Sequence, residues 1–286
     1  MCLIAFAIGA HPACPLLIAG NRDEFFERPT APLHRWTPPG SPVAVWAGRD
    51  LRDGGTWLGF GENGRVAMLT NVRSAQPGSG ARSRGELPLR WLASHDGVEA
   101  LADGIDPAAY GGFNLVVGDF PAGRWAWLSN RDPADPHTEG AATQLQWRTL
   151  SPGIYGVSNA ALDTPWPKTE RLKAAMRQAL DQWDSPPSGD MAGQHLAQAL
   201  AENAAVPDAH LPPTGVPQDW ERALSSPFVD MTERGYGTRS SLLARVTVSP
   251  GTAQPLLTMT EWRHERPTAG AHRWSAAPPA ITQVTW

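Results

Sequence analysis

The sequence predicts an α+β fold in which helices are layered on sheets, and three features of its pattern support this class. Short apolar runs, partly β-branched and typical of buried strands, occur in the first quarter of the chain. Two segments with helical periodicity follow beyond the middle, and strand patterns return after residue 240. Strands, then paired helices, then strands is an order expected when helices cover the faces of sheets.

The chain opens with a predicted β-hairpin. Apolar runs at 3–8 and 16–19 flank a proline-containing connection, which indicates two antiparallel strands buried on both faces. If the turn centres near Pro12, paired residues have numbers that sum to about 24. This register places Cys2 beside Arg22 at one end of the hairpin.

The remaining elements are predicted from local patterns. The proline-rich stretch 28–42 is predicted to be a loop. One helix is expected at 86–94, a second after Asp163 with a cap residue and an early proline at its start, and a third at about 191–202. No repeat or boundary interrupts the pattern, so residues 1–286 are predicted to form a single domain. Further strands are expected at 43–47, 65–71, 113–119, 124–129, 144–149, 154–158, 241–248 and 256–262.

Composition and motifs exclude several function classes. Hydrophobic residues make up 41% of the 286, ample for a core, and the net charge of −4 gives no electrostatic footprint for nucleic acid. No apolar run is long enough to span a bilayer, and the start lacks the cationic region of a signal peptide, so a cytoplasmic protein is expected. Phosphate-loop, HExxH and GxSxG motifs are absent and the 8 histidines never approach ligand spacing, so no metal site is predicted.

Two compositional features bear on a site. The chain has 2 cysteines, Cys2 and Cys14. The hairpin register separates them by roughly 25 Å at about 3.3 Å per residue, so no disulfide is expected. The 13 tryptophans suit core and loop anchoring, and a surplus of indole also suits a flat, apolar ligand.

Cys2 carries the most informative chemistry. Methionine aminopeptidase removes Met1 when residue 2 is small, so we expect a mature chain that begins with a cysteine and its free α-amine. The amine titrates at about 8 and the thiol at about 8.5, so one residue supplies a nucleophile and its general base near neutral pH. The alternative is that Cys2 is a small buried hydrophobe at the start of an edge strand.

A polar tetrapeptide faces Cys2 in the predicted register. Asn21, Arg22, Asp23 and Glu24 follow directly on the second apolar strand. A carboxylate at this place accepts a hydrogen bond from the α-ammonium or the thiol, and Arg22 favours the thiolate. The alternative, a solvated strand end with a local ion pair, suits Glu24 better than the three residues before it, which adjoin a buried strand.

Several blocks of the sequence together resemble one protein family. MCLIAFA at the start and NRDE at 21–24 are followed by GGTWLGF, LTNVR, SRGELP, YGGFNLVVGD, LSNR, YGVSNAALDTPWPK and YGTRSS. In this order, and over nearly the whole chain, they are similar to the blocks of the NRDE-motif proteins of the transport-and-Golgi-organisation type. Residues 190–227 and 263–286 match weakly and are expected to be peripheral.

That family in turn resembles the N-terminal-nucleophile hydrolases, especially the branch that uses an N-terminal cysteine to cleave linear amides. The resemblance implies a four-layer αββα sandwich. Asn71 in LTNVR is a further candidate for a polar group at the site. The catalytic residues that the resemblance implies are Cys2 as nucleophile, Asp23, Asn159 and, more loosely, Arg239.

Ordinary acyl-transfer chemistry connects these residues. Attack of Cys2 on an amide carbonyl develops an oxyanion, which a preorganised donor such as the Asn159 amide stabilises by roughly 3 kcal/mol. Arg239 and Asp23 then hold the thiol and the amine in productive protonation states. The structural alternatives are a turn residue for Asn159 and for Asn71, and an ion pair beside a turn for Arg239.

Position 20 departs from the pattern of the hydrolases. The hydrolases carry an arginine three residues before their aspartate, and this chain has Gly20 there. Arg22 is not an automatic substitute, because side chains alternate along a strand.

Trp57 in GGTWLGF is interpreted as a packing residue, with a ligand-lining role as the alternative. The candidate binding residues are Asn21, Arg22, Asn71 and Trp57.

The sequence leaves two functions open. The first is an N-terminal-cysteine hydrolase that cleaves a linear amide bond of a small molecule and requires no cofactor. The second is a non-enzymatic carrier, implied by the link of NRDE-type proteins to haem trafficking. No CxxCH motif or fixed axial ligand is visible, so haem would be held weakly and reversibly. Fold does not decide between the two, because sites are grafted onto folds.

Overall fold

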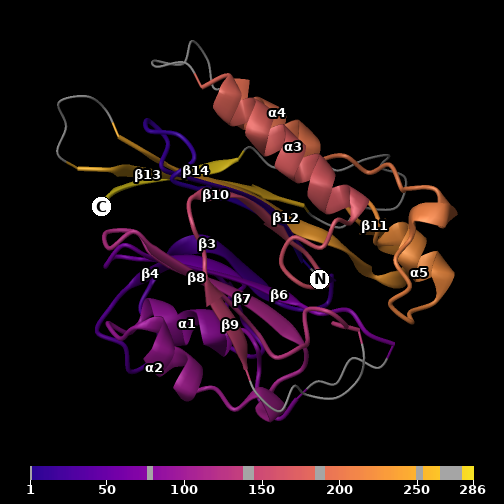
Figure 1. Ribbon diagram of the computed structural model, residues 1–286, viewed down its shortest axis with the longest axis horizontal. Coiled ribbons are helices and arrows are strands. Elements are labelled where there is room, and N and C mark those ends of the chain that lie inside the picture. The colour runs from indigo at the N-terminus through magenta and orange to yellow at the C-terminus, as the bar shows by residue number, and fades with distance from the viewer. Residues whose placement is uncertain (1, 76–79, 138–144, 184–190, 249–253, 265–278) are drawn as a thin grey trace.

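The computed structural model describes residues 2–75, 80–137, 145–183, 191–248, 254–264 and 279–286, and within them two seven-stranded antiparallel sheets stack face to face (Figure 1). The first sheet has, in spatial order, β10 (Gly153–Val157), β1 (Cys2–Ile8), β2 (Leu16–Phe25), β12 (Tyr236–Thr247), β13 (Leu256–Arg263) and β14 (Ala280–Thr285), with β11 (Asp230–Met231) beside β12. The second has β3 (Thr30–Trp36), β4 (Val45–Asp50), β5 (Leu58–Gly61), β6 (Arg65–Asn71), β7 (Phe113–Asp119), β8 (Arg124–Ser129) and β9 (Gln146–Thr149).

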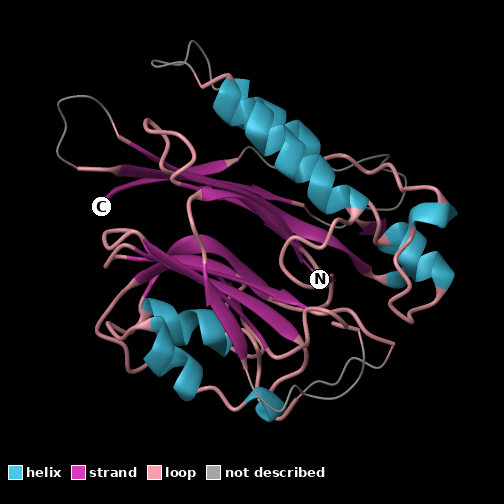
Figure 2. Cartoon of the chain, viewed as in Figure 1, coloured by secondary structure: helices cyan, strands magenta, loops and turns pink. Residues whose placement is uncertain are grey.

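Helices cover the outer face of each sheet (Figure 2). The pair α3 (Pro167–Asp181) and α4 (Met191–Leu200) packs on the first sheet, and the pair α1 (Glu86–Leu92) and α2 (Val98–Asp103) packs on the second. This four-layer αββα sandwich confirms the predicted α+β class. No helix in the described part of the chain combines the length and the apolar character that crossing a bilayer requires.

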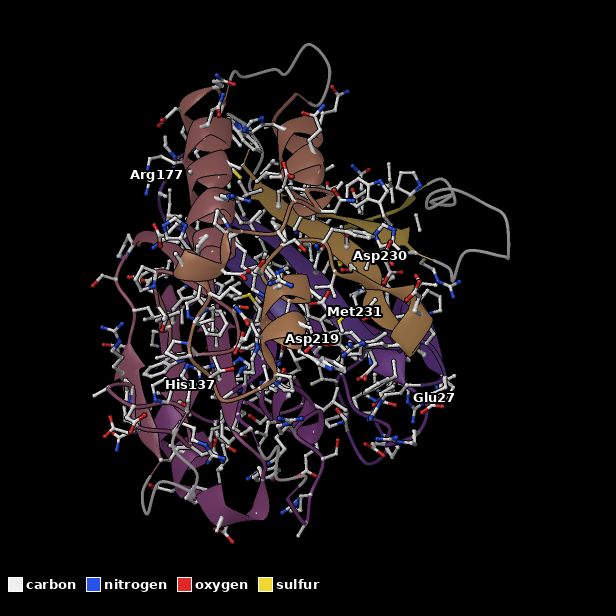
Figure 3. The ribbon with its side chains drawn as sticks, turned by 90° about the vertical axis from the view of Figure 1, so that its right-hand side faces the viewer. Glu27, His137, Arg177, Asp219, Asp230 and Met231 are labelled. Carbon is white, nitrogen blue, oxygen red and sulfur yellow. The ribbon has the colours of Figure 1, made fainter. Side chains whose placement is uncertain are left out.

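A short helix and strand close one end of the first sheet. Figure 3 shows α5 (Gln218–Ala223), marked by Asp219, close to β11, marked by Asp230 and Met231. Met231 and residues of the α5 segment pack in one small apolar cluster, which holds this end of the molecule together.

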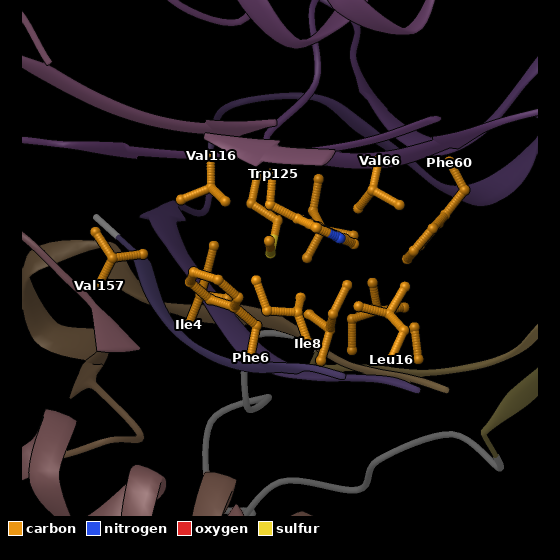
Figure 4. Packing of buried hydrophobic residues seen from close by; sticks show 14 of the residues in the cluster. Ile4, Phe6, Ile8, Leu16, Phe60, Val66, Val116, Trp125 and Val157 are labelled. Atoms are coloured by element: carbon orange, nitrogen blue, oxygen red, sulfur yellow. The ribbon is translucent and has the colours of Figure 1, made fainter. Parts of the chain in front are cut away.

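Alternation along β1 explains how one strand serves two cores. Ile4 and Phe6 point toward the second sheet, where Val66 and Trp125 face them (Figure 4). Leu3, Ala5 and Ala7 point the other way, into the core beneath α3 and α4. Each fully buried side chain of this size contributes roughly 1.5–3 kcal/mol. The unbroken apolar run of β1 is therefore the pattern of a strand covered on both faces.

The predicted hairpin register is confirmed. Cys2 pairs with Arg22 and Ile8 pairs with Leu16, so paired numbers sum to 24. β1 also pairs with β10, which makes it an inner strand and not the edge strand considered above. Cys2 and Cys14 are both free thiols, as the register predicted.

The proline-rich stretch 28–42 contains a strand that the sequence did not reveal, so its assignment as a loop was wrong. β3 pairs with β4 at one edge of the second sheet, and its register shifts between Ala31 and His34. Pro32 lies at this irregularity, and an edge strand tolerates proline because one row of its backbone groups needs no partner in the sheet.

The start of α3 also differs from expectation. The helix begins at Pro167 with Trp166 at the N-cap, and no side chain caps it. The expected cap residue, Asp163, instead has a φ of 59° and accepts a hydrogen bond from the Gly156 backbone at 2.8 Å. A proline does begin the helix, as predicted, but it is the second proline of TPWP, Pro167.

Phe6→Ala is expected to lower the free energy of unfolding by about 3–5 kcal/mol, because it leaves a cavity between the sheets. Phe6 is fully buried and its ring stacks on Tyr155 at 5.4 Å. Urea unfolding followed by tryptophan fluorescence measures the change. Leu51→Ala, at a side chain that is 55% exposed, is the control and should change stability by less than about 0.5 kcal/mol. Equal effects of the two substitutions would contradict this account of the core.

Candidate functional site

A cavity of about 250 Å³, here called the Cys2 cavity, lies at the start of β1. Its wall comes from the ends of β1, β2 and β6, from the connection between β4 and β5, and from the turn that precedes α1. The predicted site residues that line it are Cys2, Arg22, Asp23, Trp57 and Asn71. The hairpin register and the second sheet together thus collect most of the predicted site in one place.

Cys2 lines this cavity and is buried. Burial raises the pKa of the thiol, and the Asp23 and Glu24 carboxylates raise it further. Arg22, the cross-strand partner of Cys2, lowers it. The guanidinium of Arg22 is steadied by Glu24 at 3.5 Å and by the Thr30 hydroxyl at 3.4 Å. The site therefore holds a protonated thiol whose ionisation depends on nearby charges.

Asp23 is a buried carboxylate held across the sheet. It pairs with Thr238 of β12, whose Oγ1 donates a hydrogen bond to Asp23 Oδ1 at 2.7 Å. Burial raises the pKa of Asp23, while the cations Lys168 and Arg73 lower it. A carboxylate that is desolvated and yet supported by cations is a common arrangement in catalytic sites.

Two asparagines connect the cavity to the backbone of Cys2. Asn159 Nδ2 donates to both the backbone oxygen and Oδ1 of Asn71, each at 3.1 Å. The Ser158 hydroxyl lies 3.0 Å from the Cys2 carbonyl and 3.1 Å from Asn159 Oδ1. Asn71 lines the cavity, and Asn159 lies behind it. The amide that can reach a substrate is therefore that of Asn71, with Asn159 as its support.

Asn21 does not lie in the Cys2 cavity. Its Nδ2 donates to the carbonyls of Leu200 and Pro227, both at 2.9 Å, and its Oδ1 accepts from the Ser241 hydroxyl at 2.6 Å. Strand alternation places it on the helix side of the first sheet. The contacts are those of a buried structural asparagine that connects β2 to α4 and β12.

Arg239 also lies outside the Cys2 cavity. The register of β12 against β2 shifts between Thr238 and Ser240, and Arg239 is the extra residue there. Its Nη1 donates to three backbone carbonyls at the end of β2 and in the β2–β3 connection, at 2.9–3.2 Å. Arg239 lines a second cavity of about 230 Å³, which shares part of its wall with the first.

The absence of an arginine at position 20 has a steric reason. A Cβ added to Gly20 would lie 2.9 Å from the Leu3 carbonyl oxygen and 3.4 Å from Cη2 of Trp57. The Trp57 indole occupies the space that a longer side chain would need. Trp57 thus both packs against Gly20 and forms part of the cavity wall.

Sequence reasoning did not single out Arg84, which reaches the cavity from the turn before α1. Its Nη1 donates to the Gly112 carbonyl at 2.9 Å, and no carboxylate of the described residues forms an ion pair with it. Burial lowers the pKa of Arg84, while Cys2 and Glu24 raise it. By contrast, Arg28 at the rim is held by several carboxylates. Arg84 is therefore a cation available to an anionic group.

A buried charge cluster whose cations lower the pKa of Asp23 was also not predicted from the sequence. Lys168 and Arg73 are both buried, and Arg73 forms an ion pair with Glu221 of α5. The only local signal was the presence of lysine and arginine in TPWPK and LTNVR, because burial is a property of the assembled chain. Across the described ranges, no three histidine, cysteine or acidic side chains are grouped as a metal site requires.

The fold and the site define an αββα sandwich with a buried cysteine at the start of its first strand, in the wall of a small polar cavity. The chain belongs to the Transport and Golgi organisation 2 family, whose family model matches residues 1–250. The bovine Transport and Golgi organization protein 2 homolog is 32% identical over 260 residues, covering 86% of this chain and 88% of the relative. The human homolog is 31% identical with the same coverage, and the Drosophila melanogaster protein is 28% identical over 84% of this chain.

Among solved structures, a variant of conjugated bile acid hydrolase from Clostridium perfringens is similar to this chain at a TM-score of 0.47 and 10% identity. The match covers 99% of this chain and 97% of the hydrolase. A second variant of the same hydrolase matches with a TM-score of 0.40.

Arg22→Gln is expected to slow alkylation of Cys2 by iodoacetamide at pH 8, by roughly three- to tenfold. Loss of the guanidinium raises the thiol pKa further, so less thiolate is present. Intact-mass kinetics across pH 6–10 measure the profile, with Cys14, whose pKa burial raises to about 12, as an unreactive internal thiol. Arg52→Gln at the exposed rim is the control. A profile that moves equally in both variants would rule out the local effect of Arg22.

Proposed function

We propose that the protein is an N-terminal-cysteine hydrolase that cleaves a linear amide bond of a small molecule, with Cys2 as the nucleophile after removal of Met1. The observation that carries this proposal is that Cys2, Asp23 and Asn71 all line one cavity. A cavity of about 250 Å³ suits a small molecule or one arm of a larger one, and not a folded chain.

The residues support a two-step acyl transfer. Cys2 Sγ attacks the amide carbonyl, and its proton passes by way of the free α-amine to the leaving amine, which departs as the C–N bond breaks. Water then attacks the thioester, releases the acid and returns the proton to Cys2. Asn71 Nδ2 donates one hydrogen to the Val72 carbonyl at 3.3 Å and has a second for the developing oxyanion. Asp23 orients the amine.

In this proposal Arg84 selects the substrate. Its guanidinium lines the cavity while only one of its donors is engaged, by the Gly112 carbonyl. A planar cation of this kind binds a carboxylate in a bidentate manner. The favoured substrate is therefore an amide whose acyl or amine part carries an anionic group.

Haem carriage, the alternative function, fits the cavity less well. Of the side-chain types that commonly bind haem iron, the wall contains only Cys2, and Trp57 is its sole tryptophan. Other tryptophans, such as Trp125 and Trp127, are buried in the core between the sheets. Arginines and carboxylates make up much of the wall, whereas a mostly apolar macrocycle needs apolar walls.

Cys2→Ala is expected to lower kcat/KM for the best amide of a panel of N-acyl anilides by at least about a thousandfold. Intact mass must show loss of Met1 from the active wild-type protein. Cys14→Ala, at a buried thiol remote from the cavity, is the matched control and should retain activity. Hydrolysis that survives in the Cys2→Ala protein, or an active protein that keeps Met1, would refute the proposal. A Soret shift on haem titration, with no hydrolysis of any panel member, would favour the carrier.

Arg84→Gln is expected to raise KM about tenfold for a carboxylate-bearing amide and to leave KM for its neutral analogue unchanged. The physical reason is loss of a charge-assisted hydrogen bond with the substrate. Arg82→Gln, two residues away and paired with Glu86 on the surface, is the control. Equal losses for charged and neutral substrates would show that Arg84 supports the fold and does not select the ligand.

A further inference from the structure

A row of cross-strand pairs leads from Cys2 across the first sheet. Cys2 pairs with Arg22 on β2, and Arg22 pairs with Ser240 on β12. Ser240 in turn pairs with Arg263 on β13. Directly paired residues point to the same face of a sheet, and here it is the inner face, because Ile4, two residues from Cys2, packs toward the second sheet. The row therefore spans three strand spacings, or about 14 Å from Cys2 to Arg263.

The two cavities lie along this row. Cys2 and Arg22 line the Cys2 cavity, Arg263 lines the second one, here called the Arg239 cavity, and Ser240 lines both. Because the cavities have wall residues in common, they are adjacent, and one extended molecule can occupy both. The residues common to the two walls are Thr30, Ala31, Ser240 and Glu261.

A buried glutamate fixes the wall that the two cavities share. Glu261 on β13 is 6% exposed, and its Oε2 accepts a hydrogen bond from the Leu33 backbone N–H on β3 at 2.8 Å. This bond joins the first sheet to the edge strand of the second sheet. Residues 30–31, at the start of the same edge strand, complete the shared wall. The two sheets thus hold this wall in place.

Two arginines bring positive charge to the Arg239 cavity. Nη1 of Arg239 is engaged by three backbone carbonyls, whereas Nε and Nη2 form no hydrogen bond with any described residue. Arg263 is exposed, and no carboxylate of the described ranges forms an ion pair with it. The His264 backbone N–H donates to the Arg239 carbonyl at 2.9 Å, which keeps the end of β13 beside the bulge in β12. Both guanidinium groups therefore have donors to offer a ligand.

The other groups of the wall favour a carboxylate as that ligand. Glu261 is the one carboxylate among the lining residues, and His264 is neutral near pH 7, because burial lowers its pKa to about 4. A carboxylate has two oxygens that match a guanidinium and carries a single negative charge. A phosphate would bring up to two charges beside Glu261. Phe26, whose ring centroid lies 5.8 Å from Cζ of Arg239, offers an apolar surface to the carbon chain of the ligand.

We propose that the substrate of the Cys2 site is an extended amide whose far end carries a carboxylate, and that Arg239 and Arg263 bind this carboxylate in the Arg239 cavity. That the occupant is a substrate rests on the proposed function. The binding of an extended carboxylate does not, because it needs only the thiol and the walls of the two cavities.

Alkylating labels that react with Cys2 measure this binding without catalysis. The long label is an iodoacetamide with a carboxylate about 14 Å from its reactive carbon, and the short label is N-iodoacetylglycine. Each is compared with its neutral carboxamide by intact mass. The wild type should react with the long carboxylate at least about fivefold faster than with its carboxamide, because of charge-assisted hydrogen bonds. Arg263→Gln should remove this preference and leave the behaviour of the short label unchanged. Cys14, buried and with a pKa of about 12, should stay unlabelled.

The choice of variants keeps the test decisive. Arg263 has an exposed side chain, so its replacement is expected to leave the fold intact, whereas Arg239→Gln also removes contacts to three carbonyls. Arg35→Gln, at an exposed arginine of β3 paired with Glu62, is the matched control and should keep the preference. A long carboxylate that reacts no faster than its carboxamide in the wild type would overturn the inference. An unchanged preference in Arg263→Gln, or an equal loss in Arg35→Gln, would overturn it as well.

Hydrolysis provides a second readout that separates the two proposals. Arg263→Gln should raise KM about fivefold for an amide with a long carboxylate tail and leave KM for its neutral analogue unchanged. Absence of hydrolysis by the wild type, with the label preference present, would count against the proposed function alone. Hydrolysis by the wild type, with a label preference that does not depend on Arg263, would count against the carboxylate subsite alone.

Discussion

The antiparallel register between β1 and β2 is the constraint on which the Cys2 site depends. It sets Cys2 opposite Arg22, and the pairing of β2 with β12 then sets Asp23 opposite Thr238. A slip of one residue would turn Cys2 toward the helices and every apolar side chain of β1 to the wrong core. Because both faces of β1 are packed, such a slip is strongly disfavoured, and the thiol is held in place by the hydrophobic cores on either side.

Burial and charge oppose each other throughout the site. Desolvation raises the pKa of both Cys2 and Asp23, which disfavours the ionised forms that chemistry needs. Cations then act in the other direction: Arg22 on the thiol, and Lys168 with Arg73 on the carboxylate. Charges in a desolvated setting interact more strongly than in water, so fixed cations are effective there. The charges around Cys2 and Asp23 are therefore held in place by the fold before any ligand binds.

Sequence patterns within a few residues predicted the elements that depend on neighbouring residues alone. The length and composition of the first apolar runs report burial directly, so the hairpin and its register were predictable, as were most inner strands. β3 was not, since Pro32 is tolerated only because its strand ends up at a sheet edge. The placement of Arg239 depends on a bulge in β12 that no local signal marks. Arg84 and Lys168 look like ordinary charged residues until the fold buries them.

The end of β6 joins the two halves of the site. Asn71, its last residue, presents an amide to the cavity, while Arg73, two residues later, enters the buried charge cluster with Glu221. The backbone N–H of Arg73 donates to the Asn159 carbonyl at 2.8 Å, so the segment that carries the cluster also holds the asparagine that supports Asn71. The proposed oxyanion donor, Asn71, and the charge cluster of Arg73 and Glu221 therefore share one backbone segment. A displacement of this segment would disturb both, which makes its rigidity as important to the site as any single side chain.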